Sequence, residues 1–453
     1  MSDIQSNTRH IVIIGNGIAG ITCARHIRKN DSEVKITIIS GETKHFFSRT
    51  ALMYIFMGHM KYHHTKPYED HFWEKNRLDL VHDWVRDIEV DQKKLQLRQG
   101  KPIHYDQLVL ALGSKYNKFG WPGQDLTGVQ GLYSYQDLEL MEANTKNCQR
   151  AVIVGGGLIG IEMAEMLLSR DIAVTFLVRE KGFWDNVLPD EESQLVGRHM
   201  LEHHIDLRLE TELEEILDDG KGGVKAIITK SGEEIPCQFV GLAVGVSPNI
   251  GLVKETAIEV NRGILVDEYF GTNVPDVYAI GDCVEYRTPP PLRPSIEQVW
   301  YTGRMHGETL AYNLTHEPVV YRPGPWFNSA KFLDIEYQTY GVVPCAWKLP
   351  VESFYWEHPN GKTSFRALFD GESRQLLGVN SFALRLRHEF FDQVLQHQGT
   401  VDEILPQLNL ASFDPEFHDN HHKEILKAFE NQFGLKLKPS KKKKKGIAAF
   451  FGF

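Results

Sequence analysis

Residues 10–42 restrict the possible folds more than any other stretch, because a short apolar segment there leads into a glycine-rich turn. The apolar run 10–14 has the length of a buried strand, and Gly15-Asn-Gly17-Ile-Ala-Gly20 follows it directly. A helical pattern then continues to Lys29, and a second strand rich in β-branched residues is expected over 34–39. This order of strand, glycine turn, helix and strand is typical of a dinucleotide-binding unit.

Each glycine of this turn has a physical role. Gly15 allows a tight turn, Gly17 lets the backbone approach a pyrophosphate, and Gly20 lets the helix lie close to the strand. The helix N-terminus offers free N–H groups and a positive dipole to phosphate. An acidic residue about 20 positions further on should bind a ribose hydroxyl, and Glu42 is the candidate. The predicted cofactor contacts in the turn are Gly15, Gly17, Ile18, Ala19 and Gly20.

The same unit occurs a second time. The run 150–154 leads into a second glycine turn, and a helical segment to Leu168 and a strand over 173–178 follow. The predicted contacts of this turn are Gly155, Gly157, Leu158, Ile159 and Gly160. A chain with two dinucleotide sites can hold a flavin and a nicotinamide dinucleotide and pass a hydride between them. FAD and NAD(P)H are therefore the predicted cofactors.

Length and composition describe an ordinary multidomain globular protein. A chain of 453 residues is too long for one core, and 42% hydrophobic and 24% charged residues are typical of soluble proteins. A formal charge of −10 argues against a nucleic-acid-binding body. No run reaches the ~18 apolar residues of a membrane span. A polar N-terminus without signal-peptide features makes a cytoplasmic location the expectation.

The cysteines and histidines exclude two kinds of site. None of the five cysteines forms a C-x-x-C pair, so electrons leaving a flavin must pass to an acceptor outside the protein. The histidines of residues 59–76 have no cysteine or carboxylate at metal-ligand spacing, and no metal site is predicted.

Three further buried strands end in residues suited to ligand binding. The strand over 105–110 leads to Ala111 and Gly113, and the strand over 239–244 ends at Gly245. The strand before Gly281 delivers Asp282 at its carboxyl end, where ligands bind in open α/β sheets. The Asp282 carboxylate is a candidate to hydrogen-bond a ribityl or ribose hydroxyl.

Two other segments are expected to face a flavin. Residues 44–54 are rich in aromatic side chains and Met and include Arg49, as expected of a segment lying over a ring system. A core-packing helix is the alternative. Residues 293–314 are predicted to form a helix whose N-terminus would stabilise negative charge on a reduced flavin.

The predicted fold is α/β, with two Rossmann-like domains and a C-terminal α+β domain. The predicted domains are an FAD domain (8–123 and 244–320), an NAD(P) domain (124–243), an α+β domain (321–435) and a basic tail (436–453). The α+β domain would serve as a lid over the flavin or a dimer surface, so a monomer or homodimer is expected. The lysines 441–445 predict either a disordered end or weak contact with an anionic surface, such as the inner membrane face.

Together these motifs resemble the flavoproteins with two dinucleotide-binding domains, the pyridine nucleotide-disulfide oxidoreductase superfamily. Over roughly residues 10–340 the chain is most similar to the ferredoxin and rubredoxin reductase branch and its NADH oxidase relatives. The resemblance implies that the first glycine turn and 272–282 bind FAD, and that the second turn binds NAD(P)H. It further implies that Glu162 lies near the nicotinamide and that Glu297, Gln298 and Val299 begin a helix facing the flavin. The predicted catalytic residues are Glu162, Glu297 and Arg49.

Several residues depart from the family pattern. Glu42 comes one position later than the usual ribose acid, and no cysteine follows Phe47, which disfavours peroxidase-type and CoA-disulfide members. The residues point to different nicotinamide cofactors. Gly160 favours NAD, whereas Arg179 could bind the 2′-phosphate of NADPH. NADPH is weakly preferred.

The predicted activity is electron transfer from NAD(P)H through FAD to an external acceptor. A small iron–sulfur protein of the ferredoxin or rubredoxin type is the favoured acceptor. The alternatives are an NAD(P)H:quinone reductase, an NAD(P)H:dioxygen reductase and a flavin-bound redox-signalling or interaction protein. No residue pattern separates these possibilities.

Overall fold

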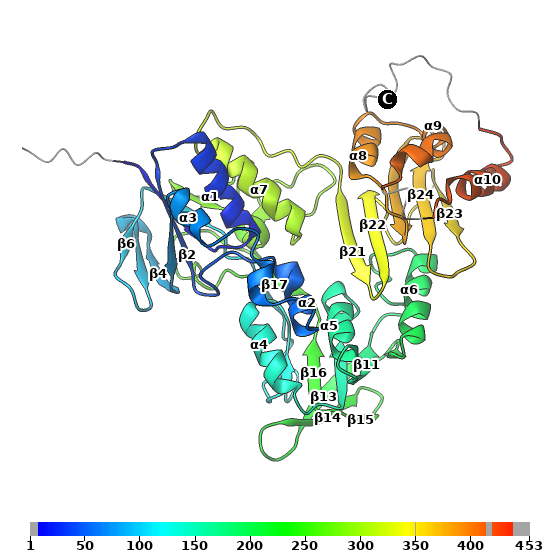
Figure 1. Ribbon diagram of the computed structural model, residues 1–453, viewed down its shortest axis with the longest axis horizontal. Helices are drawn as coiled ribbons and strands as arrows, with labels where there is room; N and C mark the ends of the chain where they lie inside the picture. The colour runs from blue at the N-terminus through cyan, green and yellow to red at the C-terminus, as the bar shows by residue number, and fades with distance from the viewer. Residues whose placement is uncertain (1–7, 349, 414–418, 438–453) are drawn as a thin grey trace, which may run out of the picture. The chain divides into compact units, whose positions relative to one another are not determined.

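The computed structural model describes residues 8–348, 350–413 and 419–437 and divides into two compact units (Figure 1). Unit 1 comprises Met1–Val154, Met166–Ala173 and Leu213–Pro323; unit 2 comprises Gly155–Glu165, Val174–Glu212 and Gly324–Phe453. The lysines 441–445 lie outside the described residues. The predicted domain boundaries stay a prediction.

A five-stranded parallel sheet forms the core of unit 1. Its order is β19 (Val277–Ala279), β7 (Gln107–Leu110), β1 (His10–Ile14), β2 (Lys35–Ser40) and β3 (Leu78–His82). The central strand β1 has almost no exposed side chain from Ile11 to Ile14, as expected of a parallel strand covered on both faces. The sheet therefore brings the carboxyl ends of β1, β7 and β19 to one edge.

Two helices of unit 1 pack tightly beside that edge. Helix α1 (Ile18–Asn30) follows the first glycine turn and lies against α7 (Trp300–Asn313). A Cβ on Gly307 would come within 2.5 Å of the Ala19 carbonyl oxygen, so the helices cross at a distance that only glycine allows. The prediction that the second helix begins at Arg293 is wrong. Pro294 disfavours helical backbone at the residue before it, and Val299 is still extended.

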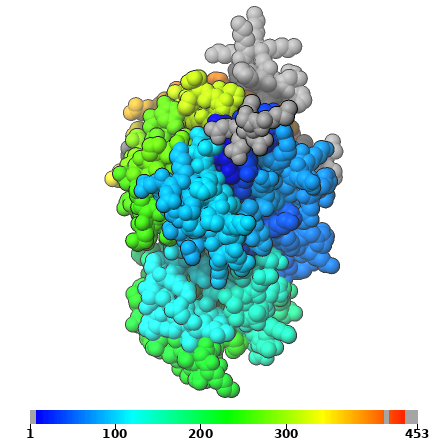
Figure 2. All heavy atoms as spheres, turned by 90° about the vertical axis from the view of Figure 1, so that its left-hand side faces the viewer, coloured from blue at the N-terminus to red at the C-terminus, as the bar shows by residue number. Residues whose placement is uncertain are grey.

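Smaller elements complete unit 1. Strands β4 (Val85–Glu89), β5 (Lys94–Leu97) and β6 (Ile103–His104) form an antiparallel sheet, as do β13 (Leu213–Asp218), β14 (Val224–Thr229) and β15 (Glu234–Pro236). The short pairs are β8 (Ser114–Tyr116) with β17 (Val246–Pro248) and β18 (Ile264–Val266) with β20 (Val284–Tyr286). The other helices are α2 (Leu52–Phe56), α3 (His71–Lys75) and α4 (Tyr135–Asn144). Figure 2 shows a face of the molecule on which sky-blue residues lie beside green residues that are far from them in the sequence.

The second predicted βαβ unit is also present, and the chain passes from unit 1 to unit 2 within it. In unit 1, β10 (Arg150–Val154) pairs in parallel with β16 (Phe239–Leu242), which pairs with β9 (Val129–Gln130). Helix α5 (Leu158–Leu168) follows the second glycine turn. In unit 2, β11 (Ala173–Leu177) pairs in parallel with β12 (Asp206–Arg208), and α6 spans Asp190–Glu202.

The remainder of unit 2 is an antiparallel sheet with helices. Its order is β21 (Phe327–Phe332), β22 (Ile335–Gly341), β25 (Leu376–Phe382), β24 (Ser364–Asp370) and β23 (Val351–Glu357). Helices α8 (His388–Gln396), α9 (Val401–Ile404) and α10 (His422–Phe433) contribute to the same apolar core as the strands. Strands β21 and β22 are joined by a tight turn in which Leu333 adopts left-handed backbone, at φ 57°.

The architecture confirms the predicted fold class: two parallel-sheet modules and an antiparallel α+β region. Among the described residues, no helix is both long and apolar enough to cross a bilayer.

Candidate cofactor sites

The first glycine turn is closely packed at its two ends and open between them. Gly15 adopts φ 110°, and a Cβ there would come within 2.1 Å of the Ala111 carbonyl oxygen. A Cβ on Gly20 would come equally close to the Gly15 oxygen, at 2.1 Å. At Gly17, by contrast, a Cβ would meet no atom within 4 Å. The open backbone at Gly17, directly before the N-terminus of α1, fits the approach of a dinucleotide pyrophosphate.

The second glycine turn repeats this backbone geometry. Gly155 has the same φ of 110°, and its N–H donates to the Leu177 carbonyl at 3.0 Å. In the first turn the N–H of Gly15 donates to Ile39 at 2.8 Å. Helix α5 begins at Leu158, so Leu158, Ile159 and Gly160 lie in its first turn. Both turns therefore meet the backbone requirements of a dinucleotide site.

Asp282 lies at the end of β19, in a small network of hydroxyl groups. Its Oδ2 accepts hydrogen bonds from the Tyr133 hydroxyl at 3.2 Å and from the Ser114 hydroxyl at 3.4 Å. The side-chain amide of Gln298 donates to the Ser114 oxygen at 2.6 Å. Burial raises the pKa of Asp282 above its ordinary value. Asp282 and Gln298, both predicted from the sequence, thus share one network in unit 1.

The glycines beside this network hold positions that a larger residue would strain. Gly113 and Gly281 have φ of 68° and 77°, in the left-handed region. A Cβ on Gly281 would lie 2.9 Å from Ala19 Cβ, and one on Gly113 would lie 2.9 Å from the Tyr133 hydroxyl. Gly245, at φ 88°, lies near Asn117, whose N–H donates to the Gly245 carbonyl at 3.0 Å.

Glu42 and Arg49 form a bidentate ion pair. Both carboxylate oxygens of Glu42 accept from the Arg49 guanidinium, at 2.8 and 2.6 Å, and the Tyr135 N–H donates to the same carboxylate at 2.8 Å. The guanidinium also donates to the Tyr133 carbonyl at 2.5 Å. Burial lowers the pKa of Arg49, but Glu42 outweighs that effect and the net shift is upward. Glu42 therefore has a protein partner besides the predicted ribose.

Glu297 is held by neighbouring side chains before the start of α7. It pairs with Arg293 at 3.2 Å, with side-chain exposures of 1% and 3%, and accepts from the Thr302 hydroxyl at 3.1 Å. Burial raises the pKa of Glu297 despite the opposing effect of Arg293. Val299 is the N-cap of α7, and in the irregular segment before it the Gln298 side chain donates to the Ser114 hydroxyl.

Two predicted residues belong to the second dinucleotide module in unit 2. Burial, and then the charge of Glu165, raise the pKa of Glu162 to about 7, although Lys331 opposes the shift. Glu165 is itself ion-paired with Lys331 at 2.7 Å. Arg179 follows β11 with 73% of its side chain exposed, and its Nε donates to Glu180 at 2.6 Å. Glu180 raises the pKa of Arg179.

Sequence reasoning missed Tyr133. Its hydroxyl accepts from the Ser114 N–H at 2.8 Å and donates to Asp282, and the Arg49 guanidinium lies 4.6 Å from its ring centroid. Tyr133 therefore joins Arg49 to Asp282. No motif contains it, and its only sequence signal is an aromatic residue between two predicted elements.

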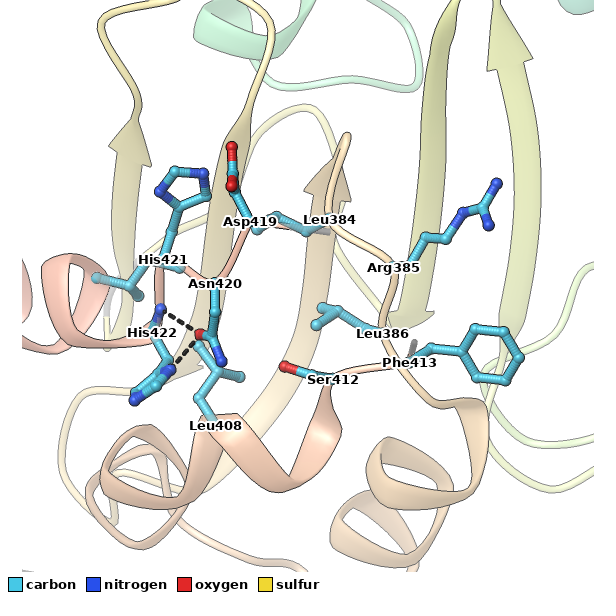
Figure 3. A pocket seen from close by; sticks show the side chains of 11 residues that line it. Leu384, Arg385, Leu386, Leu408, Ser412, Phe413, Asp419, Asn420, His421 and His422 are labelled. Carbon is cyan, nitrogen blue, oxygen red and sulfur yellow. Dashed lines mark hydrogen bonds between the residues drawn. The ribbon is translucent and has the colours of Figure 1, made fainter. Parts of the chain in front are cut away.

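One small cavity occurs in unit 2, away from both glycine turns in the chain. Its volume of about 30 Å³ suits roughly one water molecule and no dinucleotide. Figure 3 shows Asn420 hydrogen-bonded to His422 at its edge, with Leu384, Leu386 and Leu408 among the apolar lining.

Comparisons with known proteins agree with this arrangement. The family described as pyridine nucleotide-disulphide oxidoreductase matches residues 9–307. A nitric oxide reductase FlRd-NAD(+) reductase of Salmonella heidelberg is 32% identical over 280 residues, which cover 61% of this chain and 73% of the relative. This chain therefore belongs to the pyridine nucleotide-disulphide oxidoreductase family.

Solved structures share the fold over almost the whole chain. A NAD-dependent persulfide reductase from A. fulgidus has a TM-score of 0.81 at 23% identity and covers 94% of this chain and 84% of its own. Putidaredoxin reductase, in a covalent complex with putidaredoxin, has a TM-score of 0.76 at 20% identity, covering 93% and 99%. The family match confirms the predicted class of an FAD-dependent NAD(P)H oxidoreductase and its cofactors, FAD and NAD(P)H.

Proposed function

We propose that this oxidoreductase passes electrons from NAD(P)H through FAD to a separate small iron–sulfur protein. The main support for the proposal comes from the cysteine side chains. All five cysteines lie in the described residues and are free. Burial raises the pKa of four of them, Cys23, Cys148, Cys237 and Cys283, which disfavours the reactive thiolate. Electrons that reach the flavin therefore need an acceptor outside the chain.

The residues of unit 1 would hold FAD. The open backbone at Gly17 and the N-terminus of α1 bind its pyrophosphate, and Asp282 binds a hydroxyl of its ribityl chain. Arg49 and Gln298 lie in the same hydrogen-bonded network and would contact the flavin ring. The bound flavin supplies an acceptor for a hydride and a donor of single electrons.

The second glycine turn would hold NAD(P)H. Gly157 and the first turn of α5 would bind the nicotinamide dinucleotide's pyrophosphate, and Glu162 would lie near the nicotinamide. A carboxyl group with a pKa of about 7 can accept or donate a hydrogen bond near neutral pH. Arg179 contacts the adenosine ribose or its phosphate.

The relatives support an iron–sulfur acceptor. The 32% identical relative from Salmonella is named nitric oxide reductase FlRd-NAD(+) reductase. One neighbour in fold is joined covalently to putidaredoxin. A quinone or dioxygen acceptor and a signalling role without rapid turnover remain alternatives that the experiment distinguishes. Dimerisation and use of the α+β region as a lid stay predictions.

The test is steady-state oxidation of NADH and NADPH with a panel of acceptors. The panel contains a [2Fe–2S] ferredoxin, a rubredoxin, a short-chain ubiquinone and dioxygen alone. We expect kcat/KM for one of the two iron–sulfur proteins to exceed that for ubiquinone by at least about tenfold, a difference of roughly 1.4 kcal/mol in transition-state stabilisation. Faster turnover with ubiquinone or dioxygen would overturn the acceptor assignment. Negligible turnover with every acceptor would favour the signalling role.

A further inference from the structure

Two histidines lie one helical turn apart where α6 ends. The sequence His199-Met-Leu-Glu-His203 places the imidazoles at i and i+4, on one face of the helix end. Their ring centroids are 4.5 Å apart. This is the spacing at which helical histidine pairs bind zinc in other proteins, including the H-x-x-E-H arrangement.

A carboxylate from a distant part of unit 2 meets both imidazoles. Asp334 lies in the turn between β21 and β22, and its Oδ1 contacts Nε2 of His199 and lies 3.0 Å from Nε2 of His203. The three groups offer donor atoms that all lie within 4.8 Å of one another. Two imidazole nitrogens and one carboxylate oxygen form a recognised zinc donor set.

The other ring nitrogen of His199 supplies an independent observation. The His199 side chain is 1% exposed, and its Nδ1 is buried without a hydrogen-bond partner among the described residues. The Glu202 carboxylate lies 3.5 Å from this nitrogen. Because the Asp334 carboxylate only accepts, a neutral His199 ring hydrogen-bonded to it carries its proton on Nε2 and leaves Nδ1 as an acceptor. A ring that binds a metal through Nε2 must carry its proton on Nδ1, which would then face Glu202.

We propose that His199, His203 and Asp334 bind a divalent transition-metal ion of the zinc class. An ion bound through Nε2 requires the remaining proton of each imidazole to lie on Nδ1. For His199 binding converts an unpaired buried nitrogen into a donor facing Glu202, the carboxylate–histidine–metal arrangement common in metalloproteins. Three protein ligands leave one position of a tetrahedral ion for water.

Metal binding requires the three side chains to move apart. Ligands about 2.0–2.1 Å from a tetrahedral ion lie roughly 3.3 Å apart. The separation of 3.0 Å between His203 and Asp334 and the shorter contact between His199 and Asp334 must therefore both widen. Asp334 is 58% exposed and His203 is 37% exposed, so both side chains can move and the ion can enter from solvent.

Lys362 competes with the ion for the same carboxylates. Its Nζ lies 3.4 Å from Oδ2 of Asp334 and 3.9 Å from Glu202. A bound dication would displace this ammonium group into solvent, which its 38% exposure allows. Removing the lysine charge should therefore increase metal affinity.

A second cluster, His358, His421 and Glu424, provides an internal comparison. Its donor atoms are also within 4.8 Å of one another. Here, however, the Asn360 N–H donates to Nδ1 of His358, and Nδ1 of His421 pairs with Glu424 at 3.2 Å. No buried unpaired ring nitrogen distinguishes this cluster among the described residues. We therefore assign the ion to His199 and not to His421.

The experiment titrates untagged, chelator-treated, FAD-loaded protein with Co²⁺ and Zn²⁺. Cobalt binding is followed by visible ligand-field absorption, and zinc binding by calorimetry. We expect one equivalent to bind, and loss of a direct ligand in His203→Ala to weaken binding by more than about 100-fold. Glu202→Gln should weaken it by about tenfold, and Lys362→Met should strengthen it. The flavin spectrum and melting temperature of each variant report whether it folds.

Two matched variants serve as controls. His204→Asn removes the neighbouring imidazole at a position of φ 62°, where asparagine is well tolerated, and His421→Ala removes the second cluster. Both should bind metal as the wild type does. Equal affinity of the wild type and His203→Ala, or no binding by the wild type, would overturn the proposal and leave a hydrogen-bonded cluster only.

Discussion

The Tyr133 hydroxyl donates a hydrogen bond of 3.2 Å to Oδ2 of Asp282 and accepts one of 2.8 Å from the Ser114 N–H. A single phenol thus connects Ser114, the first residue of β8, with Asp282, which follows β19. Strand β7, which precedes β8, pairs in parallel with β19 in the sheet of unit 1. Asp282 is held before any ligand arrives, which lowers the cost of ordering it on binding.

Replacing Asp282 should reduce flavin content. Asp282→Ala removes the carboxylate proposed to bind the ribityl chain, and a hydrogen bond to a charged group contributes roughly 1.5–3 kcal/mol. We expect FAD affinity to fall by more than about tenfold, as measured by the absorbance ratio of purified protein and by fluorescence titration. Asp87→Ala is the matched control, because Asp87 is exposed on β4 and accepts from the neighbouring Ile88 N–H. Full flavin content in both variants would refute the assignment of Asp282.

Substitutions at two glycines of the first turn should affect protein folding and FAD binding separately. In Gly17→Ala the added Cβ meets no protein atom and the backbone, at φ −70°, suits alanine. FAD affinity should fall on the order of tenfold while the melting temperature of the flavin-free protein stays unchanged. In Gly15→Ala the Cβ meets the Ala111 oxygen at φ 110°, so the fold itself should lose roughly 1–3 kcal/mol. Equal effects of the two variants on both measurements would contradict this division.

Arg179 should influence the choice of nicotinamide. We expect the wild type to prefer NADPH, and Arg179→Ala to lower kcat/KM for NADPH about tenfold, because one charge-assisted hydrogen bond contributes roughly 1.5 kcal/mol. The measurement compares kcat/KM for NADH and NADPH in both proteins. Glu180→Gln should be measured in the same comparison, because the Glu180 carboxylate pairs with the Arg179 guanidinium at 2.6 Å. If the wild type prefers NADH and Arg179→Ala does not change that preference, the prediction is wrong.

Glu162 should make stability depend on pH. Burial raises its pKa in the folded protein to about 7, from 4.5 in the unfolded chain. The folded state therefore holds the proton more tightly, and the resulting stability is complete below about pH 4.5 and is lost as pH rises through 7. Glu162→Gln should gain on the order of 2 kcal/mol over the wild type between pH 5 and pH 8. Melting temperatures at the two pH values check this, and a constant difference between the proteins would contradict it.

The sequence by itself determined the features that are local. A buried strand, a glycine turn and a helix are encoded by neighbouring residues, so the two dinucleotide units, the α/β class and the cofactors could be predicted. Gly15 and Gly155 share φ 110° because each motif imposes the same backbone conformation on a few consecutive residues. The hairpin between β13 and β14 was predictable for the same reason, since its turn residues 218–223 are contiguous.

Only the tertiary structure decided which distant side chains meet. Tyr133 reaches Asp282, 149 positions later, and His203 reaches Asp334, 131 positions later. The ion pair between Glu42 and Arg49 could not be predicted either, because an acid and an arginine seven positions apart in an irregular segment have no fixed geometry. Such long-range side-chain contacts depend on strand order, loop paths and rotamers across the whole unit. Periodicity and motif spacing describe only one element at a time and therefore carry no information about them.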